Sequence, residues 1–244
     1  MHVEGARRIA RIAHQSGVAR YIHVSHLNAK QDSPSKFYRS KAEGEIAVSE
    51  AFPGSTIVRP GWLFGHEDRL LNTVARWPIS FRLNNQETLI RPAHVLDVAE
   101  AMKIMMNADS TMGQTFSLAG PKVYSFEDLI RIGELETVTK LQGFNVPKFL
   151  ASAVTRVWEN VWWPTLSPDE ITRRFLDDLP DEKGTLSWEY LGMKPDALEE
   201  LAVLYLRRHR SAQYYDRMFF PRFVISVHEA DLFDRQDQVL FRVD

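Results

Sequence analysis

An amphipathic helix followed at once by a short apolar strand, and then by the same pair again, most limits how this chain can fold. The residue pattern predicts a helix over residues 3–15, a strand over 21–25, a helix over 35–51 and a strand over 55–59. Strands that are apolar throughout are typical of parallel sheets covered on both faces. Short connections between alternating helices and strands imply right-handed crossovers. We therefore predict an α/β fold with a Rossmann-like, doubly wound parallel sheet.

The rest of the chain continues with further helices and strands, joined by polar turns. We expect two strands, 81–83 and 88–91, around a turn at Asn84-Asn85. The other predicted elements are a helix over 69–77, a helix opening at Pro92, a strand over 113–118, helices opening at Ser125 and Ser167, and a last helix over 195–210.

Composition excludes several classes of function. The chain has no cysteine, which rules out disulfides, thiolate metal sites and thiol catalysis. Its formal net charge of −2 argues against a general nucleic-acid partner. No apolar run reaches the ~20 residues that a membrane-spanning helix needs. The histidines show no HxxxH or HExxH spacing, so we predict no metal site.

A tryptophan-rich segment, Val146–Pro164, stands out in the C-terminal part. Its apolar residues recur at helical spacing, and it carries few charges. Two interpretations are open. The segment packs as the core of a small lobe, or it docks on a membrane surface or a partner protein, where tryptophan is favoured.

Three places along the first part of the chain are expected to face one cleft. Ser25 ends the first strand, Lys41 lies on the following helix, and Pro60-Gly61 ends the second strand. Open α/β sheets bind ligands at the carboxyl ends of their strands. A lysine there could donate hydrogen bonds to ribose hydroxyls. On these residues alone, an exposed helical lysine is the simpler interpretation.

The wider pattern resembles a known superfamily. The motifs GVARYIHVS, KAEGE and TIVRPGWLFG are similar to those of the short-chain dehydrogenase/reductase superfamily, in its extended, atypical branch, over roughly residues 1–140. FYRSKAEGE and HEDRLLN narrow the resemblance to an accessory-subunit branch found in mitochondrial NADH:ubiquinone oxidoreductase (complex I). This narrower likeness extends to about residue 210.

The resemblance implies a dinucleotide site without catalysis. The superfamily places a tyrosine four residues before its lysine, and here that position is Phe37, which has no phenol to exchange a proton. Tyr38 is one step along, which turns ~100° around a helix, so we expect it to point elsewhere. The cofactor-binding residues implied are Ser25, Phe37, Lys41, Pro60, Gly61, Trp62 and Leu63.

The glycine-rich loop that cradles a pyrophosphate is not in the sequence. None of the 12 glycines forms GxGxxG or GxxGxxG, so we expect a chain that begins three strands into the family's fold. The resemblance then implies a partial NAD(P)-binding domain over 1–140, a helical lobe over 141–210 and a tail over 211–244 that we leave unassigned. Structural NADPH is expected in the full-length protein, and weak binding if any in this chain.

The leading hypothesis is a non-catalytic accessory subunit on the matrix side of the mitochondrial inner membrane. Its partners would be other complex I subunits, with Val146–Pro164 contacting them or the membrane surface. The first alternative is an NAD(P)-dependent reductase or epimerase of the same superfamily. The second is a soluble sensor that binds a dinucleotide without catalysis.

Overall fold

Three short parallel strands form the central sheet of the protein. In the computed structural model, which describes residues 1–76, 79–138, 142–146, 167–180 and 184–210, their order is β1 (Ile22–Val24), β2 (Thr56–Pro60) and β7 (Thr115–Leu118). Val24, Val58 and Phe116 lie side by side across the sheet. Within the described residues β1 pairs on one side only, so it is an edge strand.

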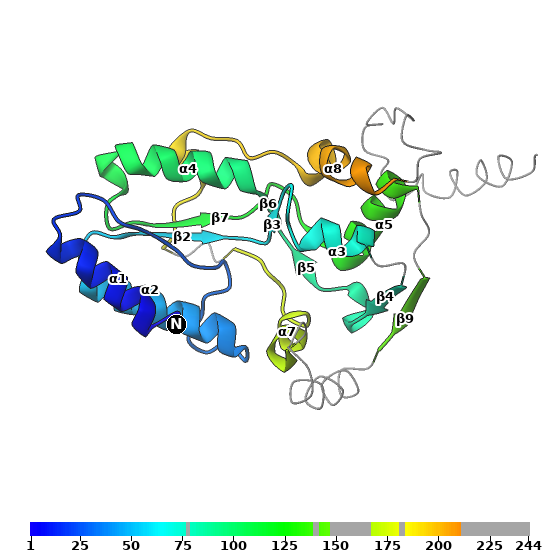
Figure 1. The fold of residues 1–244 in the computed structure, drawn as a ribbon, viewed down its shortest axis with the longest axis horizontal. Helices are drawn as coiled ribbons and strands as arrows, with labels where there is room; N and C mark the ends of the chain where they lie inside the picture. The colour runs from blue at the N-terminus through cyan, green and yellow to red at the C-terminus, as the bar shows by residue number, and fades with distance from the viewer. Residues whose placement is uncertain (77–78, 139–141, 147–166, 181–183, 211–244) are drawn as a thin grey trace, which may run out of the picture.

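Helices cover both faces of this sheet (Figure 1). The first two helices, α1 (Glu4–Gln15) and α2 (Lys36–Ala51), pack together on one face, and α4 (Val95–Asn107) lies on the other. Ala10 and Val48 are fully buried between the first two helices. Met105 of α4 is fully buried against the opposite face. The predicted doubly wound α/β architecture is confirmed.

Local capping chemistry explains where several helices begin. Ser35 caps α2, and its hydroxyl accepts from the Tyr38 amide. Ser125 and Asp128 form a reciprocal capping box at the start of α5 (Phe126–Thr137). Ser167 caps α7 (Pro168–Arg173), which has proline in its first turn. All three helix starts agree with the sequence prediction.

The predicted turn at Asn84-Asn85 does not join two paired strands. A 3₁₀ turn, Asn84–Gln86, stands there instead, between β4 (Ile79–Arg82) and β5 (Leu89–Ile90). The flanking strands pair elsewhere: β4 runs parallel to β9 (Gln142–Asn145), and β5 antiparallel to β8 (Tyr124–Ser125). The hairpin prediction was therefore wrong, because partners distant in sequence take the strand edges that a local turn would have joined.

Two helix boundaries also differ from the prediction. The helix expected at Pro92 begins at Val95, because β6 (Ala93–His94) first pairs in parallel with β3 (Leu63–Phe64). The helix expected over 195–210 is the shorter α8 (Leu198–Leu206), followed by the 3₁₀ turn Arg207–His209.

A second core lies beside the sheet. It brings α3 (Leu70–Arg76) together with α5 and α8, around the fully buried side chains Phe64, Leu71, Leu129, Leu198 and Leu206. Residues between α7 and α8 return to the sheet. The Ser117 amide donates to the Leu186 carbonyl at 2.8 Å, and the Trp188 indole donates to the Ala119 carbonyl at 2.7 Å. The C-terminal elements therefore contact the parallel sheet directly.

The crossing of the chain at Pro92 is unusually close. A Cβ added to Gly120 would lie 1.8 Å from the Pro92 carbonyl oxygen, and one added to Gly61 would lie 2.4 Å from the Arg91 carbonyl oxygen. Only glycine fits at these two positions, because the backbone of the crossing segment occupies the place of a side chain.

Two predictions fall outside the described residues. The tryptophan-rich segment lies in 147–166 apart from Val146, and the unassigned tail lies in 211–244. Across the described part of the chain, none of the helices combines the length and the apolar character needed to cross a bilayer.

Candidate functional site

Three of the residues singled out from the sequence meet at the carboxyl end of β1. The Lys41 ammonium donates to the Val24 carbonyl at 3.3 Å and lies 5.8 Å from the centre of the Phe37 ring. Ser25 is 4% exposed, and its amide continues the ladder to Val58 at 2.7 Å. Alternation along the strand places the Ser25 side chain on the same face as His23, which faces α2 near Gly44.

The Phe37 and Tyr38 rings lie beside each other, edge to face with their centres 5.7 Å apart, and both contact the His26 ring, so Tyr38 is nearer to Phe37 than the helical rotation predicted. Phe37 shares its face of α2 with Lys41, four residues on. The Tyr38 ring is 1% exposed and packs 4.9 Å from the His26 ring, and burial raises the pKa of its phenol. The described geometry therefore puts an unreactive ring beside the lysine.

The residues after β2 divide between two environments. The Pro60 carbonyl accepts from the Leu27 amide at 2.9 Å, which holds the loop after β1 against the end of β2. The Trp62 ring turns to the second core, where it contacts Phe126 edge to face at 5.9 Å and the Arg174 guanidinium at 5.2 Å. Leu63 is 37% exposed. The Trp62 ring is thus engaged in packing against the second core.

An unexpected feature is a carboxylate that caps α2 from a distant helix. Asp169 of α7 accepts from the Ser35 hydroxyl at 2.8 Å, the Lys36 amide at 2.7 Å and the Phe37 amide at 3.2 Å. A negative charge at a helix N-terminus is favoured by the helix dipole and by the unpaired amides there. The local motif Ser-Pro-Asp-Glu predicted only the start of α7, since its partner is more than 130 positions away.

Arg173, on the next turn of α7, covers Phe37. Its guanidinium carbon lies 4.6 Å from the ring centre, a cation–π contact. The His2 and His26 rings approach the same phenyl ring edge-on, at 5.3 and 5.9 Å. Sequence reasoning missed Arg173, because no local pattern relates it to α2.

A buried acid lies behind this group. Asp178 is 0% exposed, and burial raises its pKa to about 7, an effect that the neighbouring Trp62 amide only partly offsets. The nearest ring nitrogen of His26 is 3.8 Å from its carboxylate. Burial, with Arg173 and Lys41 adding to it, lowers the pKa of His26 to about 3, so the imidazole is neutral at physiological pH.

Polar groups gather near the carboxyl end of β1. Among the described residues, the buried Ser25 hydroxyl and the His23 Nε2 atom have no hydrogen-bond partner, and Lys41 stands beside them. Hydroxyl, imidazole and ammonium groups suit the hydroxyls of a ribose. Gly61 and Gly120 serve the backbone crossing at Arg91-Pro92.

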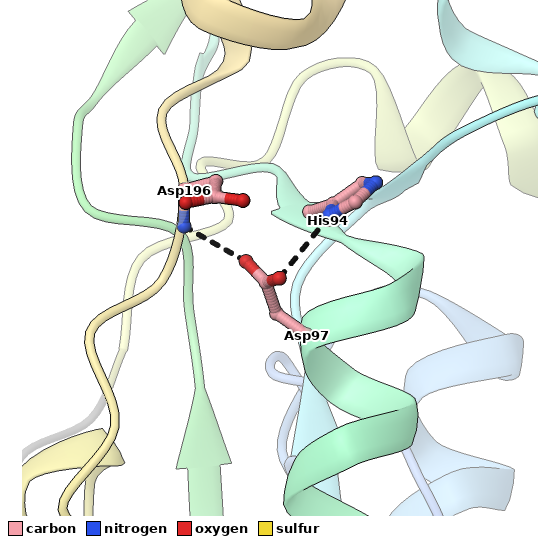
Figure 2. Close-up of side chains that lie close together, drawn as sticks. All are labelled: His94, Asp97 and Asp196. Carbon is pink, nitrogen blue, oxygen red and sulfur yellow. Dashed lines mark hydrogen bonds and ion pairs between the residues drawn. The ribbon is translucent and has the colours of Figure 1, made fainter.

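A second polar cluster lies at the start of α4 (Figure 2). The His94 Nδ1 atom is 3.2 Å from an Asp97 oxygen, and the other Asp97 oxygen accepts from the Asp196 amide at 2.8 Å. The His94 Nε2 atom lies 2.7 Å from the Tyr205 hydroxyl. Both ring nitrogens are therefore engaged, and the cluster ties α4 to α8 and to the segment before it.

Comparison with known proteins shows which proteins this chain is similar to. No family model matches the chain. It is 37% identical over 217 residues to the mitochondrial NADH-ubiquinone oxidoreductase 40 kDa subunit of Neurospora crassa, covering 88% of this chain and 58% of that one. It is 34% identical over 215 residues to the mitochondrial NADH dehydrogenase (ubiquinone) 1 alpha subcomplex subunit 9 of Rattus norvegicus, covering 85% and 56%. The chain is therefore similar, over most of its own length, to two proteins named as complex I subunits.

Partial coverage limits the likeness to these relatives. The chain spans little more than half the length of the relatives it matches. Among solved structures, an Escherichia coli NADPH-dependent quinone oxidoreductase complexed with NADPH superposes with a TM-score of 0.62 at 20% identity, covering 82% of this chain and 70% of that one. That likeness shows a shared Rossmann-like fold. The mitochondrial relationship rests on the subunit 9 homologues.

Proposed function

We propose that this chain is part of a non-catalytic accessory subunit of mitochondrial complex I. Two relatives, more than 30% identical over most of the chain, are named as subunits of NADH dehydrogenase or NADH-ubiquinone oxidoreductase. Both are also named as mitochondrial. The proposal places the chain on the matrix side of the inner membrane, in contact with other complex I subunits.

The observation that carries the non-catalytic part is the packing around Phe37. The ring faces Lys41 and lies under Arg173, and it offers no proton. The neighbouring Tyr38 is buried against the His26 ring, and burial raises the pKa of its phenol. Proton exchange with a substrate therefore lacks its donor at this position.

A cofactor site with a structural role completes the proposal. Ser25, Lys41 and the chain at Pro60–Leu63 would hold the nicotinamide–ribose half of NADPH, and Phe37 would line it. A ligand that binds only the folded state stabilises that state by mass action. The bound nucleotide would contribute hydride chemistry in related enzymes, and here it would contribute stability.

Association with complex I is the direct test. A tagged chain expressed in mitochondria of its source organism, solubilised in mild detergent, should co-migrate with complex I on a native gel. A matched sample washed at high salt should retain it, since a permanent subunit is not a loosely bound matrix protein. Persistent absence from the complex I band, with the tagged protein present elsewhere in the lane, would contradict the proposal.

A further inference from the structure

The segment that follows α7, residues 174–178, is bound at its end to two distant parts of the chain. The Asp178 amide donates to the Leu89 carbonyl of β5 at 2.8 Å, and the Leu89 amide donates to the Asp177 carboxylate at 2.8 Å. The side-chain amide of Asn28, in the loop after β1, donates to the Asp177 carbonyl at 2.6 Å. We call residues 174–178 the strap. It holds α7, the helix that caps α2, against the rest of the fold.

The side chain of Asp178 is buried where these contacts meet. It is fully buried, and neither of its carboxylate oxygens has a hydrogen-bond partner among the described residues. The His26 Nδ1 atom lies 3.8 Å away, and it accepts from the Asn28 amide at 3.2 Å, so it has no proton to donate to the carboxylate. A buried carboxylate without a donor is costly when charged, and much less so when protonated.

The groups that face this carboxyl from other elements do little to stabilise its charge. From α2, the Tyr38 phenol lies close enough for the charge of Asp178 to raise its pKa, after burial as the larger cause. His26, from the loop after β1, is neutral because burial lowers its pKa to about 3. The Trp62 amide, after β2, favours the charged form, but burial outweighs it and raises the pKa of Asp178 to about 7.

The arginines beside the strap are engaged elsewhere. The Arg173 guanidinium lies over the Phe37 ring, and the Arg174 guanidinium lies 4.4 Å from the centre of the Phe126 ring. In the part of the chain that the structure describes, neither forms an ion pair with Asp178. The docked strap therefore supplies no positive charge to this carboxyl.

We propose that a proton on Asp178 controls the strap, which stays docked while the carboxyl is protonated and opens locally, loosening α7 from α2, once the proton is lost. The inference does not depend on the proposed cofactor or on complex I. In the docked strap the carboxyl has a pKa of about 7, whereas in an open, hydrated strap it returns to its ordinary value of 3.8. Opening is therefore least favourable below about pH 4, becomes easier as pH rises to about 7, and levels off above that.

Hydrogen–deuterium exchange of the whole chain tests this between pH 5 and pH 8, after correction for the pH dependence of chemical exchange. The protection of amides in residues 171–178 should fall roughly tenfold or more between pH 5 and pH 7 and then level off. Asp178→Asn, which carries no charge at any pH, should keep its protection constant. Asp177→Asn is the matched control, because it changes the exposed neighbour and keeps an oxygen for the Leu89 amide, and it should behave as the wild type.

The wild type also provides an internal comparison. Amides of α4 should exchange more slowly than those of residues 171–178 across the whole range, because the strap opens without unfolding the sheet. This comparison decides the question even where circular dichroism shows that Asp178→Asn does not fold.

Three results would overturn the inference. The first is protection at residues 171–178 that does not change between pH 5 and pH 7. The second is a folded Asp178→Asn variant that keeps the pH dependence of the wild type. The third is equal protection of α7 and α4 at every pH, which would mean that the strap opens only when the whole molecule unfolds.

Discussion

At the scale of single residues, Phe37 stands at the position where the superfamily that the sequence resembles places a tyrosine. Phe37 keeps the shape of a tyrosine ring and lacks its hydroxyl, while Lys41 stays within 5.8 Å of it. The Lys41 ammonium, which could stabilise a phenolate, is therefore present beside a ring that has no hydroxyl. A lysine beside this ring fits the proposed role in holding a ligand, for which no proton transfer is needed.

Asp178 should make stability depend on pH in a defined direction. Burial raises its pKa from 3.8 to about 7, so the folded state keeps a proton that the unfolded chain has lost. The stability that this carboxyl contributes is full below about pH 4 and is lost as pH rises through about 7. The Asp178→Asn variant cannot titrate there. Urea unfolding should show it gaining roughly 2–4 kcal/mol over the wild type between pH 4 and pH 8.

The pKa of His26 is shifted in the opposite direction, so His26 also contributes to the pH dependence of the wild-type and Asp178→Asn stability curves. Its pKa is lowered to about 3, so its contribution to stability is lost as pH falls. Because His26 is present in both proteins, subtracting the two curves removes most of its effect. Asp32→Asn, at an exposed aspartate, should give a curve parallel to the wild type. Parallel curves for Asp178→Asn would contradict the prediction.

At the scale of elements, the cap that Asp169 provides should be measurable. Asp169→Ala removes the acceptor for two backbone amides and a hydroxyl at the start of α2, which should cost about 1–2 kcal/mol. The readout is the urea midpoint at constant slope. Asp32→Ala is the control, since it deletes an exposed aspartate in the loop just before the helix. Equal midpoints for the two variants would show that the local Ser35 cap suffices.

Helix starts could be predicted where the residues that determine them are neighbours in the sequence. Ser35, Ser125 and Ser167 mark helix starts because a capping side chain reaches only its own first turn. The pairing of β4 with β9 and of β5 with β8 could not be predicted, because the residues of a short strand do not specify which distant strand it will pair with.

The site divides in the same way. The shared face of Phe37 and Lys41 follows from helical spacing, and the position of Ser25 follows from its place at a strand end. Arg173 and Asp169 join the site through tertiary packing alone. The Trp62 ring, expected beside the cofactor, contacts Phe126 and Arg174 instead, because it packs against the second core.

At the scale of the whole molecule, the open edge of the sheet predicts poor solubility of the isolated chain. Val24 of β1 is 42% exposed, and Ile9 and Ile12 of α1 are 60% and 52% exposed. An unpaired apolar edge promotes association between copies. Val24→Lys should raise the soluble fraction on expression several-fold, because lysine blocks edge pairing. Leu204→Lys changes a 67% exposed leucine of α8 and should have little effect. A wild-type chain that stays monomeric at high concentration would refute this.

The contact of the Asp169 carboxylate with the N-terminus of α2 also bears on the order in which parts of the chain fold. Its hydrogen-bond partners lie 132 to 134 positions earlier in the chain. Contacts so far apart form late, because a long loop must close before they repay its lost entropy. On a ribosome, α2 with Lys41 can fold well before α7 has been made. Arg173 is made with α7, so its contact with Phe37 also forms only after α7 has been synthesised.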